Sequence, residues 1–188
     1  MRTSVSHPLR IAAVVSGIPG LGRVGVTLCP GKYDPRGGRY GPRVIRWNRD
    51  LALDLDTIRN WGAAAVVTLL EPQELTRLRV ERLGAEVSRR NMLWFHLPIV
   101  DAEIPDEDFE RKWAVAGGEL HSILRRGSDV LVHCRGGLGR AGTVAARLLI
   151  ELGLEPETAI KRVREVRPGA IENDEQEMYV LGLGRARK

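Results

Sequence analysis

A short glycine-rich loop between two apolar segments constrains this chain more than any other feature. Residues 130–132 have the composition of a buried strand, and residues 143–152 have that of a helix. The loop between them reads HCRGGLGRAG, with Cys134 near its start and Arg140 near its end. Backbone N–H groups converge where a strand leads into a helix, and the helix dipole is positive there. The segment therefore predicts an anion-binding loop with a thiol at its base.

The rest of the chain alternates strand-like and helix-like segments. Residues 64–70 form a continuous apolar run of strand length, which is typical of a strand buried on both faces of a parallel sheet. We expect one α/β domain over residues 1–188, with a mostly parallel central sheet, helices on both faces, and flexible ends at 1–9 and 184–188. The expected strands are 11–15, 25–28, 64–70, 93–100 and 129–133. The expected helices are 54–61, 72–90 with a break, 105–126, 143–152, 156–166 and 173–183. Residues 30–42 are expected as a loop.

The charge and cysteine content limit the possible partners. The chain of 188 residues is 43% hydrophobic and 28% charged, which fits a globular protein rather than a disordered one. A formal net charge of +5 favours anionic partners, and among these we favour phosphoproteins over nucleic acid and anionic lipid. Two cysteines, Cys29 and Cys134, are too few for a disulfide framework or a zinc site of thiolates. No apolar run is long enough to span a membrane, so we expect a soluble cytoplasmic protein. We expect no metal or cofactor, because Arg140 and the loop N–H groups would supply the positive charge that binds phosphate.

Cys134 and Arg140 are the residue types that phosphate-ester chemistry requires. A thiolate at a helix N-terminus, surrounded by backbone N–H donors, can attack phosphorus. A guanidinium stays charged and matches two phosphate oxygens with its planar fork. The glycines let the backbone turn its N–H groups inward, and His133 can hold the loop by hydrogen bonding. The alternative is a structural cysteine buried in a tight turn. The loop residues expected to contact substrate are Arg135, Gly136, Gly137, Leu138 and Gly139.

The pattern His133-Cys134-x5-Arg140 resembles the signature of the cysteine-dependent protein-tyrosine and dual-specificity phosphatases. Within that family, the loop sequence CRGGLGR is most similar to the cyclin-dependent-kinase-associated dual-specificity type and its bacterial relatives. LPIVD at residues 97–101 resembles the family's general-acid loop, and GAIE with the nearby Gln176 resembles its C-terminal glutamine segment. The likeness is clear from about residue 90 onward and patchy before residue 30. It implies the fold of a dual-specificity phosphatase and hydrolysis of phosphoproteins.

Asp101 is the expected proton donor. Expelling a seryl or tyrosyl oxygen from phosphorus needs an acid, and the resemblance assigns that role to the aspartate that ends LPIVD. Glu103, Asp106 and Asp108 are the alternatives. Asp106 and Asp108 are explained equally well as first-turn acids of the following helix, where the helix dipole stabilises them. Glu103 is expected in solvent.

Three further residues carry expectations of their own. By resemblance, Gln176 helps to place the hydrolytic water, and the alternative is an exposed amide on a helix. The family usually has serine or threonine after the signature arginine, where its hydroxyl stabilises the departing thiolate. Ala141 stands here instead, so we expect slow breakdown of the phosphoenzyme or a partial substitute from Thr143. Cys29 is expected to be buried, with a protective disulfide to Cys134 as the alternative.

Together these residues predict a phosphatase that works in two steps. Cys134 takes the phosphoryl group while Asp101 protonates the leaving oxygen, and water then releases inorganic phosphate. The expected substrate is a phosphoprotein carrying phosphotyrosine, and also phosphoserine or phosphothreonine, and free phosphate or sulfate would bind in the same loop. Arg135 and the positive net charge leave a phosphoinositide or an RNA 5′-triphosphate open. A non-catalytic phosphate-binding module and a rhodanese-like or arsenate-reducing enzyme are the other classes.

Overall fold

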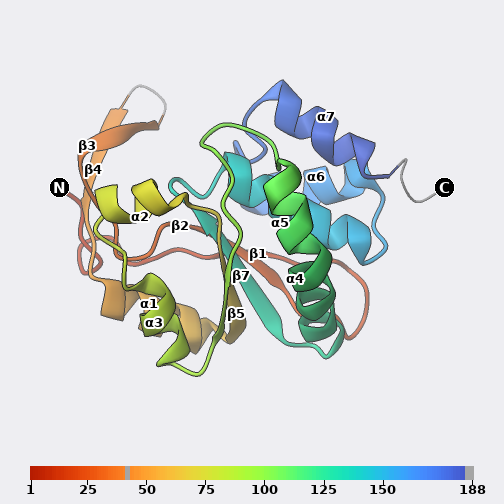
Figure 1. Ribbon diagram of the computed structural model, residues 1–188, viewed down its shortest axis with the longest axis horizontal. Coiled ribbons are helices and arrows are strands. Elements are labelled where there is room, and N and C mark those ends of the chain that lie inside the picture. The colour runs from red at the N-terminus through yellow and green to blue at the C-terminus, as the bar shows by residue number, and fades with distance from the viewer. Residues whose placement is uncertain (41–42, 185–188) are drawn as a thin grey trace.

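The computed structural model describes residues 1–40 and 43–184, which build a five-stranded sheet between two layers of helices (Figure 1). The strand order is β1-β2-β7-β5-β6, and every neighbouring pair is parallel except β1 with β2. Strand β7 lies in the centre because its apolar side chains require cover on both faces. The expected mostly parallel α/β fold is confirmed. The strands are β1 Ala12–Val14, β2 Val24–Leu28, β5 Ala63–Thr68, β6 Leu93–His96 and β7 Asp129–Cys134.

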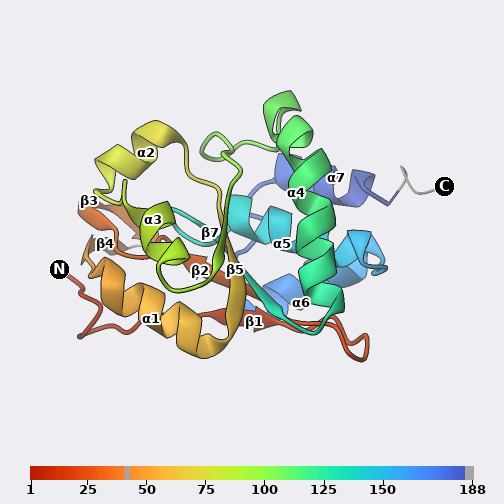
Figure 2. The ribbon, with the colours of Figure 1, turned by 60° about the horizontal axis from the view of Figure 1, so that its bottom comes forward.

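The helices divide between the two faces of the sheet. Helices α4 to α7 pack on one face and α1 to α3 on the other (Figures 1 and 2). Each face has its own apolar core, one around Phe109 and Leu120 and the other around Leu55 and Leu83. The helices are α1 Leu51–Trp61, α2 Pro72–Arg77, α3 Leu83–Ser88, α4 Glu107–Arg125, α5 Gly139–Glu151, α6 Pro156–Val166 and α7 Asp174–Gly182.

The prediction of a loop at residues 30–42 is wrong, because most of this stretch is a strand. It pairs antiparallel with the following strand in a separate two-stranded sheet, and the pairing register shifts near Gly37. Gly37 has φ 76°, and a Cβ atom there would lie 2.5 Å from the Ile45 carbonyl oxygen. The glycines and proline that indicate a loop therefore belong to an irregular β-hairpin. Backbone pairing with the neighbouring strand overrides the low strand propensity of these residues. The two strands are β3 Tyr33–Tyr40 and β4 Arg43–Asn48.

Two element boundaries differ from expectation in ways that shape the site. Helix α5 begins at Gly139 instead of residue 143, so Arg140 lies in the first turn of the helix rather than in the loop. Strand β6 ends at His96 instead of residue 100, because its partner strand β5 ends at Thr68. Residues 97–106, which we call the acid loop, then cross to the start of α4.

Helix α4 begins at Glu107, two residues later than the sequence suggests. The Asp106 carboxylate accepts a hydrogen bond of 2.8 Å from the Phe109 N–H and forms the N-cap. Pro105 therefore precedes the cap and does not open the helix.

Helix α1 ends at Gly62 as expected, since Gly62 takes a left-handed conformation with φ 105°.

Residues 1–9, expected as a flexible end, are joined to β4. The Arg2 N–H donates to the Arg46 carbonyl (2.8 Å), the Asn48 N–H donates to the Arg2 carbonyl (2.9 Å), and Leu9 is buried. Of the other expected end, 184–188, all residues after Gly184 lie outside the described residues. Within the described part of the chain, no helix has both the length and the apolar character that crossing a membrane requires.

Candidate active site

The loop of residues 134–139, which we call the phosphate loop, connects the central strand β7 to the N-terminus of α5. Cys134 ends the strand and is only 4% exposed. Its Sγ accepts a hydrogen bond of 3.2 Å from the Gly137 N–H. The sulfur thus lies at the base of the loop, where a backbone donor and the positive end of a helix both favour negative charge.

Two glycines of the phosphate loop have no room for a side chain. Gly137 has φ 68°, and a Cβ atom there would lie 2.3 Å from the carbonyl oxygen of Thr27 on β2. A Cβ atom on Gly139 would lie 2.6 Å from the Glu172 carboxylate and 2.8 Å from the Gln176 carboxamide. The loop is therefore folded tightly against its neighbours, which fixes the directions of its N–H groups.

Two cations hold the outer side of the phosphate loop, and the sequence analysis missed both. Arg167, at the end of α6, donates from Nε to the Gly137 carbonyl (2.8 Å) and from Nη2 to the Gly136 carbonyl (3.0 Å). Lys32 donates from Nζ to the Arg135 carbonyl (2.9 Å), and its burial lowers the pKa of the amine to about 8. With these carbonyls bound on the outside, the loop N–H groups are free to face inward. No local sequence pattern marks either residue.

His133 supports the loop from the side of β5. Its Nε2 lies 2.9 Å from the Thr68 hydroxyl, which also accepts a hydrogen bond of 2.9 Å from the Trp94 indole N–H. Thr68 thus links the ring of His133 to the indole of Trp94 across β7, β5 and β6. Burial lowers the pKa of His133 to about 3, so the ring is neutral at physiological pH. This agrees with the expected role in loop geometry and not in proton transfer.

Arg140 is the most heavily bonded side chain of the site. It is 2% exposed and forms two parallel hydrogen bonds with Glu74 of α2, of 2.6 Å and 3.0 Å. Its Nη1 also donates to the Ile99 carbonyl (2.9 Å), and its Nη2 donates to the Asp101 carboxylate (2.6 Å). Burial opposes ionisation of Glu74, but the bonds and charge of Arg140 outweigh it, and the pKa of Glu74 is lowered. The guanidinium is thus fixed in place by a buried carboxylate that the sequence analysis did not identify.

Asp101 reaches the site from the acid loop. Its side chain is 57% exposed and contacts the guanidinium of Arg140, in the first turn of α5. Of the three alternatives, Asp106 caps α4 and Asp108 forms an ion pair with Arg111 on the surface of that helix. The Glu103 side chain is exposed. The structure therefore brings Cys134, Arg140 and Asp101 to one site and directs the other acids elsewhere.

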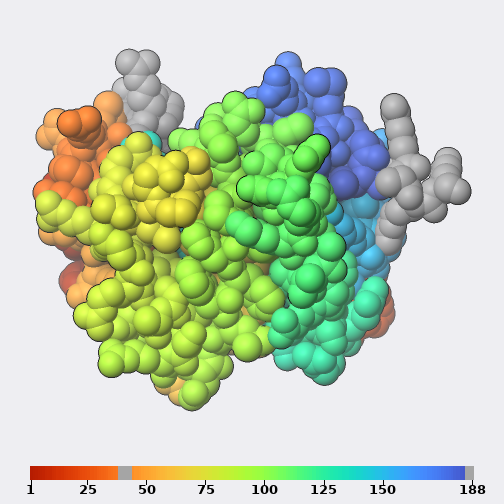
Figure 3. All heavy atoms as spheres, in the orientation of Figure 1, coloured from red at the N-terminus to blue at the C-terminus, as the bar shows by residue number. Residues whose placement is uncertain are grey.

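The N-terminus of α7 holds the acid loop down. Asn173 donates from its side chain to the Ala102 carbonyl (2.8 Å), and Gln176 donates from Nε2 to the Glu103 carbonyl (3.3 Å). Gln176 is fully buried and its Oε1 accepts from the Glu172 N–H (2.9 Å), so the expected alternative of an exposed amide is wrong. Its carboxamide packs against Gly139 at the start of α5. In the space-filling view, the atoms of α2 and of the following segments up to the acid loop form a continuous surface on the near face of the molecule (Figure 3).

Two further side chains of this region have partners that the sequence did not predict. Arg135, for which substrate contact stays a prediction, turns its guanidinium toward β3 and bonds Asp34 through Nε (3.2 Å) and Nη2 (2.9 Å). Thr143 was expected to substitute partly for the hydroxyl that Ala141 lacks. Its Oγ1 instead donates to the Gly139 carbonyl at 3.0 Å, within the helix. Leu138 is half-buried and its carbonyl starts α5 by accepting from the Gly142 N–H (2.9 Å).

The second cysteine is separate from this chemistry. Cys29 is fully buried in the core beneath α1 to α3 and, like Cys134, forms no disulfide. Burial raises the pKa of its thiol. This agrees with the expected structural role. Within the described residues, no group of three or more His, Cys, Asp and Glu side chains is arranged to hold a metal ion.

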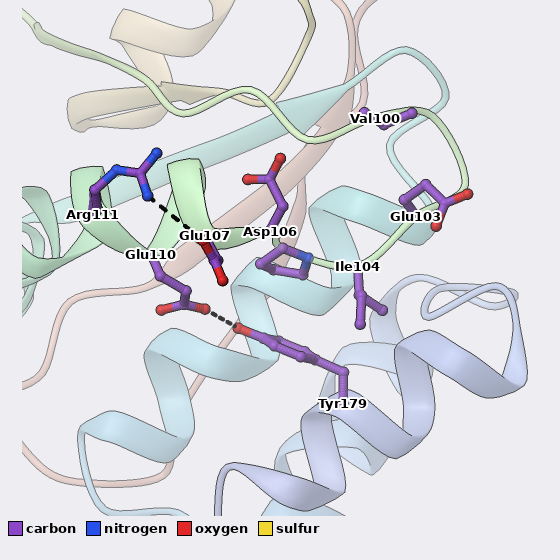
Figure 4. A pocket seen from close by; sticks show the side chains of 9 residues that line it. Val100, Glu103, Ile104, Asp106, Glu107, Glu110, Arg111 and Tyr179 are labelled. Carbon is purple, nitrogen blue, oxygen red and sulfur yellow. Dashed lines mark hydrogen bonds and ion pairs between the residues drawn. The ribbon is translucent and has the colours of Figure 1, made fainter.

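A groove of about 900 Å³ runs along the outside of the acid loop (Figure 4). Its floor is apolar, with Val100, Ile104 and Tyr179, and its charged rim is mostly acidic. We call it the acidic groove. Cys134 and Arg140 do not line it, so it neighbours the site without containing it. The charged residues of its rim are Glu103, Asp106, Glu107, Glu110 and Arg111.

Comparison with known proteins agrees with this geometry. A family model described as "Swiss Army Knife protein, DSP-PTPase phosphatase domain" matches residues 49–180. This range contains the phosphate loop, the acid loop and Glu74. The chain therefore belongs to the family of cysteine-dependent dual-specificity and protein-tyrosine phosphatases, as the resemblance in its sequence predicted.

Individual relatives lie within the same family. The chain is 33% identical to cyclin-dependent kinase inhibitor 3 of Rattus norvegicus over 135 residues, which are 70% of this chain and 62% of that protein. The chain thus spans less than two thirds of the length of this relative. It is 50% identical to protein tyrosine phosphatase type IVA 3 of Bos taurus over 139 residues, 71% of each. A crystal structure of kinase associated phosphatase, with its catalytic cysteine replaced by serine, matches with a TM-score of 0.75 at 26% identity and 92% coverage of both chains.

Proposed function

We propose that this protein is a phosphoprotein phosphatase that hydrolyses phosphotyrosine, and also phosphoserine and phosphothreonine, through a cysteinyl-phosphate. The observation that carries the proposal is the joint geometry of two groups. The Cys134 sulfur accepts a bond from the phosphate loop, and Arg140 is held at the start of α5 by a buried carboxylate. A thiolate and a preoriented guanidinium at one helix N-terminus suit attack on a phosphate ester.

In the first step, the Cys134 thiolate attacks phosphorus and the sulfur–phosphorus bond forms as the bond to the leaving oxygen breaks. Inward N–H groups of the phosphate loop and the Arg140 guanidinium stabilise the charge on the remaining phosphate oxygens. Asp101, entering the step protonated, gives its proton to the leaving oxygen. In the second step, Asp101 takes a proton from water as the water attacks phosphorus. Inorganic phosphate leaves and the thiolate is restored, and we propose that Gln176 helps to position the acid loop for this water.

The contacts of Arg140 suggest how substrate binding delivers the acid. Both Nη1 protons are directed to Glu74 and the Ile99 carbonyl, and Nη2 is shared between Glu74 and Asp101. Among the described residues, no acceptor bonds the Nε–H. A phosphate that binds Arg140 with two oxygens needs Nε–H and the Nη2–H that Asp101 occupies. Phosphate binding therefore displaces Asp101 from the guanidinium, and the exposed carboxyl becomes available to the leaving group.

The direct test is phosphatase activity of the wild-type chain and of Cys134→Ser. The wild type should hydrolyse p-nitrophenyl phosphate and phosphotyrosine peptides, with inhibition by vanadate. Cys134→Ser should lose turnover but still bind a phosphopeptide, because its hydroxyl is a poor nucleophile in an intact phosphate loop. Cys29→Ala is the matched control, since it removes the other buried thiol, and it should remain active. Hydrolysis by Cys134→Ser that EDTA abolishes would contradict the mechanism, and binding without any wild-type turnover would identify a non-catalytic module.

A further inference from the structure

A second pocket, of about 640 Å³, lies beside the phosphate loop between the β3–β4 hairpin and the end of α2. We call it the basic pocket. Its walls are joined by a hydrogen bond of 2.8 Å from the Tyr33 N–H to the Leu78 carbonyl, which connects β3 to the end of α2. Its charged lining residues are Asp34, Arg36, Arg77, Arg79 and Arg135.

The charges of this pocket do not balance. Asp34 is the one carboxylate among its described lining residues, and it is already bonded to Arg135 and to the Gly37 N–H. The other three arginines therefore add positive charge without a carboxylate of the pocket to neutralise it. Arg36 is exposed, and the side chain of Arg77 is 59% exposed with only a distant contact of 3.6 Å to Glu74. That carboxylate already bonds the buried Arg140.

Arg79 is held in a position that suits an anion. Its guanidinium stacks over the Tyr33 ring, with 4.1 Å from its central carbon to the ring centroid. Stacking fixes the plane of the guanidinium and leaves its edge N–H groups free for other partners. The backbone of Arg79 is left-handed, with φ 59°, a conformation that asparagine or glycine adopts more easily than arginine.

The basic pocket and the phosphate loop share a residue. Arg135 follows the nucleophile in the chain, and its bond to Asp34 turns its side chain from the phosphate loop into the wall of the basic pocket. Figure 1 shows the hairpin and α2 on one side of the loop that follows β7, with the acid loop and α7 on the other. The far side carries the acidic groove (Figure 4). Glu110 of its rim is paired with Arg147, but Glu103, Asp106 and Glu107 still outnumber its one arginine, Arg111, and disfavour an anion there.

We propose that the basic pocket binds a second anionic group, phosphoryl or carboxylate, on a phosphopeptide whose hydrolysed phosphate lies in the phosphate loop. This inference rests on the proposed function and names its preferred substrates. A peptide can present its anionic side to one flank of the site alone. An anionic membrane would also approach the acidic groove, so the charge distribution favours a peptide over a phosphoinositide.

The test compares a phosphotyrosine peptide with neutral neighbours against the same peptide carrying a nearby phosphoserine or glutamate. The wild type should show a kcat/KM about ten-fold higher for the doubly charged peptides, as one or two charge-assisted hydrogen bonds predict. The double variant Arg36→Gln, Arg79→Gln should lose this preference and keep its kcat/KM for the neutral peptide. Arg111→Gln, on the acidic groove, is the matched control and should keep the preference. Equal activity of the wild type on all peptides, or equal losses on all of them in the double variant, would overturn the inference.

Two further arms separate the possible failures. In the first arm, the substrate is a soluble inositol bisphosphate headgroup. If it is hydrolysed faster than every peptide, the preferred substrate is a phosphoinositide and the inference of a peptide is overturned. If the wild type hydrolyses none of these compounds, the proposed function fails, and binding to Cys134→Ser decides the pocket by itself. Calorimetry should then still show tighter binding of the doubly charged peptide, and equal affinities would reject the pocket.

Discussion

The phosphate loop and the acid loop meet at Arg140, but they are built in opposite ways. The phosphate loop is buried or half-buried at the end of the central strand, and cations, a neutral histidine and tight glycine contacts hold it in place. The acid loop runs over the surface, and its key carboxylate is 57% exposed. Among the described residues, four side-chain hydrogen bonds connect it to the site. Arg140 donates to the Ile99 carbonyl and to Asp101, Asn173 donates to the Ala102 carbonyl, and Gln176 donates to the Glu103 carbonyl.

This difference matches the two tasks that the proposed mechanism assigns to the loops. Stabilising the charge on phosphate oxygens works best with donors that are oriented in advance, because no reorganisation is then needed during the reaction. Proton delivery requires a carboxyl that leaves Arg140 when phosphate arrives and then approaches the leaving oxygen. Loops with few contacts carry such movements because opening them costs little free energy. The comparison predicts that substitutions of residues that hold the phosphate loop and Arg140 lower both stability and activity. Substitutions in the acid loop should lower activity alone.

The largest effect is expected for Glu74→Gln, which removes the charge that compensates buried Arg140. Removing one partner of a buried ion pair typically destabilises a protein by about 3–5 kcal/mol. We expect the free energy of unfolding to fall by about 3 kcal/mol, near the lower end of that range because one amide acceptor remains. The kcat/KM should fall as well. Urea denaturation followed by circular dichroism measures the first effect, and Glu103→Gln, at an exposed side chain, is the control. A Glu74→Gln protein as stable as the wild type would contradict the rigid role of this contact.

Asp101→Asn should affect catalysis without comparable loss of stability. Removing a general acid typically lowers the rate about 10²- to 10⁴-fold. Because the Asp101 side chain is largely exposed, the urea midpoint should stay close to that of the wild type. The loss of kcat should be smaller for p-nitrophenyl phosphate than for a phosphotyrosine peptide, since nitrophenolate leaves more easily without a proton. Equal losses of kcat on both substrates would contradict the assignment of Asp101 as the general acid.

The smallest effect tests the attachment of the acid loop. Asn173 caps α7 by accepting from the Gln176 N–H (2.9 Å) and also donates to the Ala102 carbonyl. Asn173→Asp keeps the acceptor for the cap and loses the donor to the acid loop. We expect a few-fold lower kcat with unchanged stability, whereas Asn173→Ala should also lose about 1 kcal/mol of stability with the cap. Identical kinetics of Asn173→Asp and the wild type would show that this bond does not hold the acid loop in its working position.

The chain order accounts for the parts of the site that could be predicted. The strand, the glycine-rich turn and the following helix are adjacent in sequence, so Cys134 and Arg140 have to meet wherever these elements form. Asp101 follows a buried apolar segment, and in a parallel sheet such segments end at the same edge as β7. The pairing of β3 with β4 could not be predicted in this way, because its glycines and prolines indicate a loop until a partner strand is present.

The residues that hold the site rigid belong to the tertiary structure alone. Glu74 lies 66 positions from Arg140, Lys32 lies 103 positions from Arg135, and Arg167 lies 30 positions from Gly137. None of them stands in a local pattern that separates it from an ordinary surface charge. By itself the sequence determined the class of fold and the adjacency of Cys134 and Arg140 around a strand-to-helix turn, because short-range geometry is sufficient for these. Only the packing of distant segments decided which carboxylate holds Arg140, where Arg135 points and which flank of the site is positive.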